Sequence, residues 1–209
     1  LRIYGYNNVE IPTQLKSSLT VQGEEDKHYH TQNIVAEQLV GEGFLEILNN
    51  SLTKASYYTD FDLNKYPDEH TVKVMNPLSA DLGVMRQTML FGGLESVSRN
   101  INHKSANLKF FEVGNTYIYN KEKWDAENPI KGYNQEGHIS LFITGKRVEG
   151  NWAHADEQSS IYELKAVVEN ILRRVGMPFN NVVVKHSDNN IFSKGVQYET
   201  RAGKVLVEL

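Results

Sequence analysis

The sequence predicts an α+β fold with a mainly antiparallel sheet flanked by helices. Residues 108–119 and 138–144 are two β-prone runs joined by a long polar segment, the pattern of an antiparallel hairpin with a long loop. Residues 160–175 carry apolar side chains at helical spacing, and a helix followed by a strand is expected near the start of the sequence. With 209 residues, 40% of them apolar, the chain can bury a core of ordinary size.

The first helix is expected from residue 24 to about Val40. Residues 24–26 are acidic and suit the positive end of a helix, while Gly41 and Gly43 provide its stop. Its apolar stripe is expected to be Ile34, Val35 and Leu39. Residues 1–20 are polar and interrupted by Pro12, so they are predicted to be a connector from a preceding domain, and residues 21–209 the main domain.

The middle of the chain predicts two strands, a turn and a helix. Residues 44–53 and 72–75 are the strand candidates, and 76–79 form a turn with Ser79 as a helix cap. Apolar residues at spacings of four, three and four then predict a helix with one buried face, formed by Leu90, Leu94, Val97 and Ile101.

The last predicted helix opens with a capping box, Ser160 with Glu163 three positions later, and ends at Gly176 and Pro178. Its expected buried side chains are Ile161, Leu164, Val167, Val168, Ile171, Leu172 and Val175. Two short β segments, residues 182–184 and 205–207, are predicted to follow.

Charge and composition exclude several classes of function. The net charge of −4 gives no bulk attraction for nucleic acid, and the basic residues Arg99, His103, Lys104 and Lys109 are interpreted as solvated. Zero cysteine excludes disulfides and thiolate metal sites. No run approaches the roughly 20 apolar residues of a membrane span, and no signal peptide is recognised. Both ends of the sequence look like cuts from a longer chain.

Three segments together resemble the nucleotide-binding core of class II aminoacyl-tRNA synthetases: residues 76–79, residues 85–90 and Phe111-Glu112-Val113-Gly114-Asn115-Thr116-Tyr117. In catalytic members the last of these strands continues into an arginine that holds the α-phosphate of ATP. Ile118 occupies that position here, and Asn120 stands where an acidic residue is expected. An alkyl group cannot stabilise phosphate charge. The resemblance therefore implies a synthetase-like core that activates no amino acid, with no catalytic, cofactor-binding or metal-binding residue of its own.

Further phrases resemble the β-subunit family of bacterial phenylalanyl-tRNA synthetases. They are residues 2–8, 42–46 and 50–53, and Tyr162-Glu163-Leu164-Lys165, after which Ala166 replaces the family's glycine. This resemblance implies a cytoplasmic assembly of two α and two β chains. The α subunit would charge tRNA(Phe) with phenylalanine, using ATP and magnesium, and this chain would hold the assembly together. The family's magnesium site and anticodon-binding domain are expected outside this sequence.

Individual polar residues are given structural interpretations. Arg86 is expected to bond loop carbonyls or a carboxylate, and Glu112 to point outward or to pair with a cation. His28 and His30 lie two apart, on different faces of a helix, so they are not expected to share a metal. His103, His138, His154 and His186 lack ligand spacing.

Other apparent motifs also favour plain structural roles. Asp60, Asp62 and Asp68 do not fit a calcium loop, because its glycine and its final glutamate are missing. Gly145-Lys146 lacks the rest of a phosphate-binding loop and is interpreted as a hairpin turn. No Gly-x-Ser-x-Gly elbow supports hydrolase chemistry.

Two alternatives remain open at this point. The first is a working class II ligase, or an amino-acid sensor, that binds a small ligand in its own pocket. The second is an RNA-binding module, which the acidic net charge disfavours.

Overall fold

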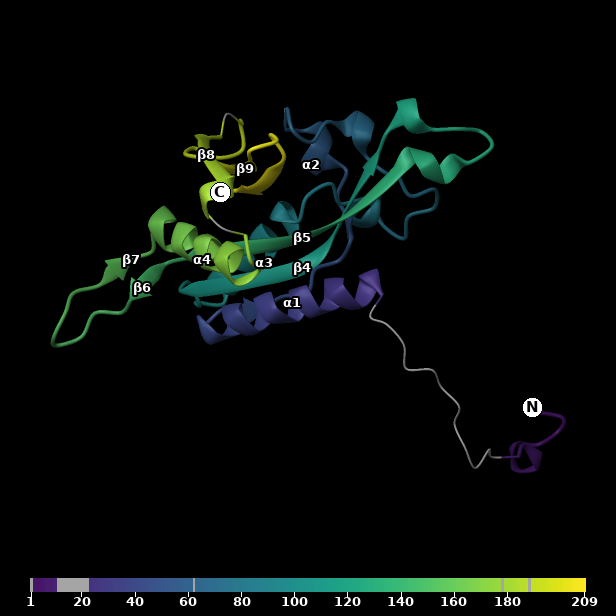
Figure 1. Ribbon diagram of the computed structural model, residues 1–209, viewed down its shortest axis with the longest axis horizontal. Helices are drawn as coiled ribbons and strands as arrows, with labels where there is room; N and C mark the ends of the chain where they lie inside the picture. Colours follow the sequence, from purple (N-terminus) through teal and green to yellow (C-terminus); the bar gives the residue numbers. More distant parts are fainter. Residues whose placement is uncertain (1, 11–22, 62, 178, 188) are drawn as a thin grey trace.

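The central sheet of the computed structural model has three strands, β1 (Leu45–Glu46), β4 (Leu108–Tyr119) and β5 (Tyr133–Thr144), in the order β1-β4-β5 (Figure 1). The structure describes residues 2–10, 23–61, 63–177, 179–187 and 189–209. β1 runs parallel to β4, and β4 pairs antiparallel with β5 along its whole length, from Leu108 opposite Thr144 to Tyr119 opposite Tyr133. The predicted antiparallel hairpin is confirmed, and its second strand begins five residues earlier than the predicted start at His138.

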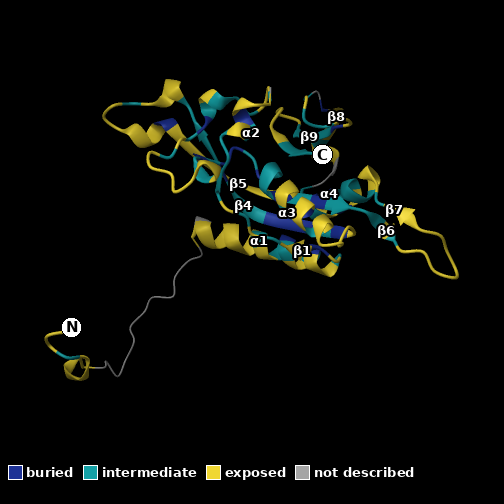
Figure 2. Cartoon of the chain, turned by 180° about the vertical axis from the view of Figure 1, so that it is seen from behind, coloured by how far each residue is buried: buried dark blue, intermediate teal, exposed yellow. Residues whose placement is uncertain are grey.

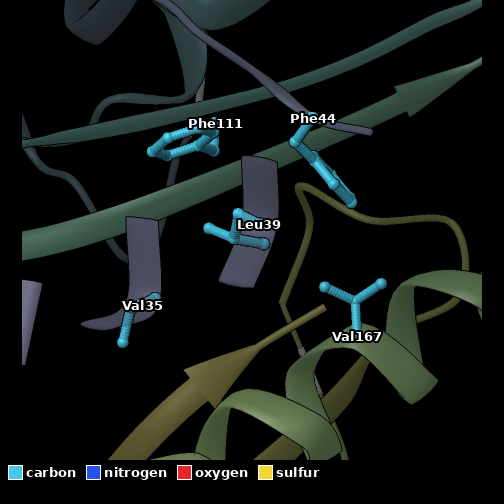
Figure 3. Packing of buried hydrophobic residues seen from close by; sticks show 5 residues of the cluster. All are labelled: Val35, Leu39, Phe44, Phe111 and Val167. Carbon is cyan, nitrogen blue, oxygen red and sulfur yellow. The ribbon is translucent and has the colours of Figure 1, made fainter. Parts of the chain in front are cut away.

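One face of this sheet is covered by α1 (Glu24–Gly41) and α4 (Ile161–Arg174). A cluster of buried hydrophobic residues lies between the two helices and the sheet, and Figure 3 shows its side chains. Its members are Val35, Leu39, Phe44, Phe111 and Val167. The predicted helix at residues 24–40 is therefore confirmed, although Ile34 of the expected stripe is only half-buried.

The opposite face of the sheet is covered by α3 (Leu90–Asn102). Val97 packs there against Leu108, Phe110 and Phe142. A Cβ added at Gly93 would lie 1.9 Å from the Phe142 ring, so the helix approaches the sheet through its glycine.

The predicted apolar stripe of this helix is partly wrong. Leu94 and Ile101 are 48% and 46% exposed. The close approach at Gly93 turns the helix so that Leu90, Gly93 and Val97 face the sheet and the other two face away.

The predicted strand at residues 44–53 is also wrong. β1 and β2 (Leu52–Thr53) are separate two-residue strands, and β2 pairs with β3 (Val84–Met85) in another sheet. The two asparagines between them redirect the chain, since the side chain of Asn49 binds Glu112 and that of Asn50 accepts a bond from the Leu52 amide. Residues 72–75 form one isolated bridge, from Lys73 to Val84, in place of the predicted strand.

The C-terminal sheet contains β8 (Val182–His186), β9 (Val196–Thr200) and β10 (Val205–Glu208), in the order β10-β9-β8. It packs on α4 through Val168, Leu172 and Tyr198. The predicted segments at 182–184 and 205–207 are confirmed. β9, which lies between them, was not predicted because polar residues dominate it.

A hairpin arm extends from the end of β5, built from β6 (Lys146–Val148) and β7 (Glu157–Gln158) (Figure 1). Gly145 has φ +76 and connects β5 to β6. The prediction of a hairpin turn at Gly145-Lys146 is wrong, because β6 pairs with β7 and not with β5. The remaining helices are α2 (Ser56–Thr59) and the 3-10 turns η1 (Tyr6–Asn8), η2 (Asp68–His70), η3 (Ala80–Leu82), η4 (Lys121–Lys123), η5 (Pro129–Gly132) and η6 (Phe179–Asn181).

The two predicted caps differ from expectation. Ser79 and Ser160 do occupy the positions before η3 and α4, but neither side chain makes a capping hydrogen bond. Glu163 turns away from the Ser160 amide and pairs with Lys109 at 2.7 Å. Ile161 and Val175, expected to be buried, lie at the helix ends and are 37% and 38% exposed.

No helix in the described part of the chain combines the length and the apolarity that a membrane crossing requires. The predicted connector, residues 1–20, falls largely on residues 1 and 11–20, which lie outside the described part.

Candidate functional site

The face of β4 that meets α3 carries part of the segment by which the sequence resembles a class II synthetase core. Side chains alternate along a strand, so Phe110, Glu112, Gly114, Thr116 and Ile118 share this face. Phe110 belongs to the core beneath α3. The four residues that follow therefore form the floor of any site built on this end of the sheet.

Glu112 and Arg86 form a buried ion pair on this floor. The carboxylate is fully buried, the Arg86 side chain is 6% exposed, and Arg86 Nη1 lies 2.6 Å from Glu112 Oε1. Arg86 Nε also donates to the carbonyl of Asn115 at 2.9 Å. The predicted structural role of Arg86, with loop carbonyls or a carboxylate as partners, is confirmed for the carboxylate, while the carbonyl that it bonds lies on β4 and not in a loop. For Glu112, pairing with a cation is confirmed and the outward orientation is wrong.

Asn49 completes this cluster from the loop after β1. Its amide nitrogen Nδ2 donates to Glu112 Oε2 at 2.8 Å, and its backbone amide donates to Glu112 Oε1 at 3.3 Å. The side-chain oxygen Oδ1 of Asn49 accepts a hydrogen bond from the Ser96 hydroxyl of α3 at 2.7 Å. Both oxygens of the buried Glu112 carboxylate thus accept hydrogen bonds from the chain itself, which leaves it poorly placed to bind the amine of a ligand.

Gly114 is required by the position of Arg86. A Cβ at residue 114 would lie 2.2 Å from Arg86 Nη2 and 2.9 Å from the sulfur of Met89. The guanidinium therefore rests on the backbone of β4 and occupies the floor. An isolated glycine within a strand can signal such a close approach, so Gly114 is the feature of the sequence that points to it.

Ile118 and Asn120 have local structural roles. Ile118 is half-buried and pairs in register with Asn134 of β5. The Asn120 side chain accepts from the backbone amides of Glu122 at 2.9 Å and Lys123 at 3.4 Å, and so caps η4. Neither side chain offers the cation or the carboxylate that nucleotide activation would need at these two positions.

A second polar cluster holds the segment before β3 against the site. The Gln87 amide nitrogen Nε2 donates to the hydroxyl of Thr71 at 2.7 Å and to the carbonyl of Pro67 at 3.0 Å, and its backbone amide donates to the Tyr58 hydroxyl at 2.9 Å. Burial raises the pKa values of the Tyr58 and Tyr66 hydroxyls. The two tyrosines therefore stay neutral. Gln87 connects Tyr58, Pro67 and Thr71, a structural role that the sequence does not reveal.

A small pocket opens beside Arg86, with a volume of about 280 Å³. Its lining comes from the loop after β1, from β2, η3 and α3, and is Asn49, Asn50, Leu52, Thr53, Lys54, Asp81, Leu82, Arg86, Thr88, Gly92 and Glu95. Ligand pockets in proteins usually enclose about 300–1,000 Å³ and are mostly apolar. This pocket lies just below that range, its surface is polar and apolar in about equal measure, and the lining residue Glu95 already bonds Lys54 and Tyr57.

The other histidine, acidic and basic residues singled out in the sequence do not gather into a site in the described part of the chain. No group of three or more histidines, aspartates and glutamates that could hold a metal is found among the described residues. His138, on β5 opposite Gly114, has its pKa lowered by burial. Asp68 pairs with Lys73 at 3.1 Å, and Asp62 lies outside the described residues. Lys109, grouped by sequence with Arg99, His103 and Lys104, lies on β4 and pairs with Glu163.

Comparison with known proteins gives one consistent result. Residues 11–207 match the family described as the phenylalanyl tRNA synthetase beta chain CLM domain. A phenylalanine–tRNA ligase beta subunit from Bacteroides thetaiotaomicron is 56% identical over 206 residues, which are 99% of this chain and 25% of that protein. The beta subunit from Porphyromonas gingivalis is 45% identical over the same shares of the two chains. The chain thus spans about a quarter of the length of the curated relatives it matches.

Solved structures give the fold independently. A pyrrolysyl tRNA synthetase from Desulfitobacterium hafniense superposes with a TM-score of 0.53 at 15% identity, over 88% of this chain and 58% of that chain. A second structure of that enzyme gives a TM-score of 0.54 at 14% identity, over 84% of this chain and 57% of that one. At this identity the likeness concerns the fold alone, and it confirms the α+β architecture expected for a class II synthetase core.

Proposed function

Since the chain belongs to the family of phenylalanyl-tRNA synthetase β-chain CLM domains, we propose that it serves as a catalytic-like scaffold within a phenylalanine–tRNA ligase. Its partner is the catalytic α subunit, in an assembly of two α and two β chains. The α subunit activates phenylalanine and charges tRNA(Phe), with ATP and magnesium held outside this chain. Residues 21–209 form the scaffold domain, and residues 1–20 connect it to the preceding part of the subunit.

The observation that carries this proposal is the occupied floor of the site. The Arg86 guanidinium lies over Gly114 and is bonded to Glu112, so the chain's own cation fills the space. Ile118 supplies an alkyl group where a catalytic core needs a positive charge. No residue of this chain is assigned a catalytic, cofactor-binding or metal-binding role.

An exposed apolar row supports the assembly role. Leu48, in the loop after β1, is 91% exposed, and Leu94 and Ile101 on α3 are about half exposed. The loop and the helix touch, because Asn49 bonds Ser96 and lies against Gly92. Contiguous exposed apolar patches mark protein interaction sites, and these three side chains would contribute to such a patch. We assign this row to the contact with the α subunit.

Two measurements test the proposal. Light scattering during size-exclusion chromatography should give a mixed complex when the full β subunit meets its purified α subunit. ATP–pyrophosphate exchange should be present in the complex and absent from this chain alone. Exchange by this chain alone would establish a working ligase in its place, and the absence of any complex with the full β subunit would refute the scaffold role.

A further inference from the structure

The C-terminal sheet, formed by β8, β9 and β10, buries few of its side chains. All three strands lie in the described part of the chain, and Tyr198 of β9 is the only buried residue within them. In the central sheet, β4 buries Leu108, Phe110 and Phe111 among others. Figure 2 shows this contrast, with buried colour along β4 and mainly intermediate or exposed colour on β8 and β9. Elements with few buried apolar contacts unfold locally at a lower free-energy cost than the core does.

The apolar support of the C-terminal sheet comes mainly from α4. Tyr198 packs against Val168 and Leu172, and its hydroxyl donates to Glu169 Oε1 at 3.3 Å. The pairing of β9 with β10 is interrupted by a register shift between Val205 and Val207. Partly buried apolar residues pack against the cluster, and they are Leu141, Met177, Val182, Val196, Val207 and Leu209.

A second attachment joins the sheet to the segment between α2 and η2. Lys65 of that segment forms an ion pair with Glu208 of β10, whose side chain is 13% exposed. Among the described residues, this is the only ion pair that connects the C-terminal sheet to another element. A partly buried carboxylate gains more from a cation than an exposed one does. Lys65 is therefore well placed to hold the sheet closed.

The two sides of this ion pair are each fixed to a different part of the molecule. On the sheet, the Ser187 hydroxyl and the Asn189 side-chain amide both donate to Glu208 Oε1. On the other side, the carbonyl of Pro67, two residues after Lys65, accepts from Gln87 Nε2 at 3.0 Å. If the ion pair breaks, Glu208 keeps two donors from its own sheet, and the Lys65 segment keeps its bond to Gln87.

We propose that the C-terminal sheet opens as a unit of its own, and that the Lys65–Glu208 ion pair holds it closed. In the open state the contacts of Tyr198 with α4 are lost, while the central sheet and its helices stay folded. Opening exposes Val168 and Leu172 of α4 to water. This inference goes beyond the proposed function, because it concerns the domain itself and requires no partner.

Hydrogen exchange of the full β subunit, followed by mass spectrometry, measures the opening. Peptides from β8, β9 and β10 should exchange about 100-fold faster or more than peptides from β4 and β5. Their exchange rates should also depend less steeply on low concentrations of urea, because local opening exposes less surface than global unfolding does. The same rates and the same urea dependence in both sheets would show one cooperative unit and overturn the proposal.

Two lysine variants test the role of the ion pair. Lys65→Met should accelerate exchange in the C-terminal sheet about tenfold or more, because a charged hydrogen bond is lost. Lys73→Met is the matched control, since its ion pair with Asp68 lies in the same region and has side chains that are 64% and 38% exposed. The control should change this exchange by less than about threefold. Similar acceleration by both variants would exclude Lys65 as the contact that holds the sheet.

A variant in the central sheet tests whether the two sheets open separately. Gly93→Ala places a Cβ 1.9 Å from the Phe142 ring, so it should accelerate exchange in β4 and β5 about fivefold or more. Exchange in β8, β9 and β10 should stay unchanged, because the strained contact persists when only the C-terminal sheet opens. Equal acceleration in both sheets would contradict separate opening. None of these measurements uses the α subunit, so their outcome is independent of the scaffold role.

Discussion

Replacing Arg86 by methionine should strongly destabilise the fold, because it leaves a buried carboxylate without its cation. Glu112 is fully buried and would retain only the two bonds from Asn49. Breaking one side of a buried ion pair typically costs about 3–5 kcal/mol. That is a large part of the roughly 5–15 kcal/mol that separates folded from unfolded proteins.

Urea unfolding followed by circular dichroism measures this loss. With a denaturant dependence of about 3 kcal/mol per molar, the midpoint should fall by about 1 to 2 M. Arg147→Met is the matched control, since it breaks an arginine–glutamate pair whose side chains are 54% and 57% exposed. An exposed pair contributes about 0–1 kcal/mol, so the control midpoint should hardly move.

The double variant Arg86→Met/Glu112→Met separates the ion pair from simple packing. Removing both charges should recover part of the stability lost by Arg86→Met, because no uncompensated charge then remains buried. Equal midpoints for Arg86→Met and Arg147→Met would refute the reasoning. The reasoning would also be refuted if the loss of unfolding free energy in the double variant equalled or exceeded the sum of the losses in Arg86→Met and Glu112→Met.

Three further results are expected. Gly93→Ala should lower stability by about 1–3 kcal/mol in urea unfolding, because its Cβ would meet the Phe142 ring at 1.9 Å. Gly41→Ala, with nothing within 4 Å of its Cβ, should be neutral or stabilising. Burial raises the pKa of Tyr198 to about 12 from 10.0. Its proton is therefore held more tightly in the folded state, and the urea midpoint should be level below pH 10 and fall between pH 10 and about 12; a phenolate absorbance titration that shows every tyrosine ionising near pH 10 would contradict this. Leu48→Asp should abolish or strongly weaken α-subunit binding by the full β subunit without changing its unfolding midpoint, because it places a charge in the apolar row; unchanged binding would remove Leu48 from the interface.

The sequence predicted elements with strong periodicity and missed those decided by distant contacts. α1, α4 and the β4–β5 hairpin follow from their apolar spacing and from glycine and proline signals. The break between β1 and β2 depends on Asn49 reaching Glu112, 63 residues away, which no local pattern encodes. The rotation of α3 depends likewise on the Phe142 ring meeting Gly93.

The candidate site shows the same division. The unusual Ile118 was visible because it breaks a known pattern, and a structural role for Arg86 followed from its position. The three internal donors to Glu112 cannot be predicted from the sequence, because they come from a loop and from the segment after β3, which lie far apart in the chain. The local pattern predicts Glu163 as half of a capping box, although its partner is Lys109 on β4. Local sequence patterns predict the interaction that a side chain could make with its near neighbours in the chain. A contact with a residue distant in sequence can form instead.

The ion pair between Lys65 and Glu208 constrains the order of folding during synthesis. Lys65 belongs to the segment before β3, and Glu208 lies in β10, where Ser187 and Asn189 also bond its carboxylate. A ribosome releases Lys65 long before it releases Glu208, at about 5–20 residues per second. The ion pair with Glu208 can therefore form only about 10 to 30 seconds after Lys65 has been synthesised. Until β10 has been synthesised Lys65 lacks this partner, so the contact between the two segments forms only after β10 is made.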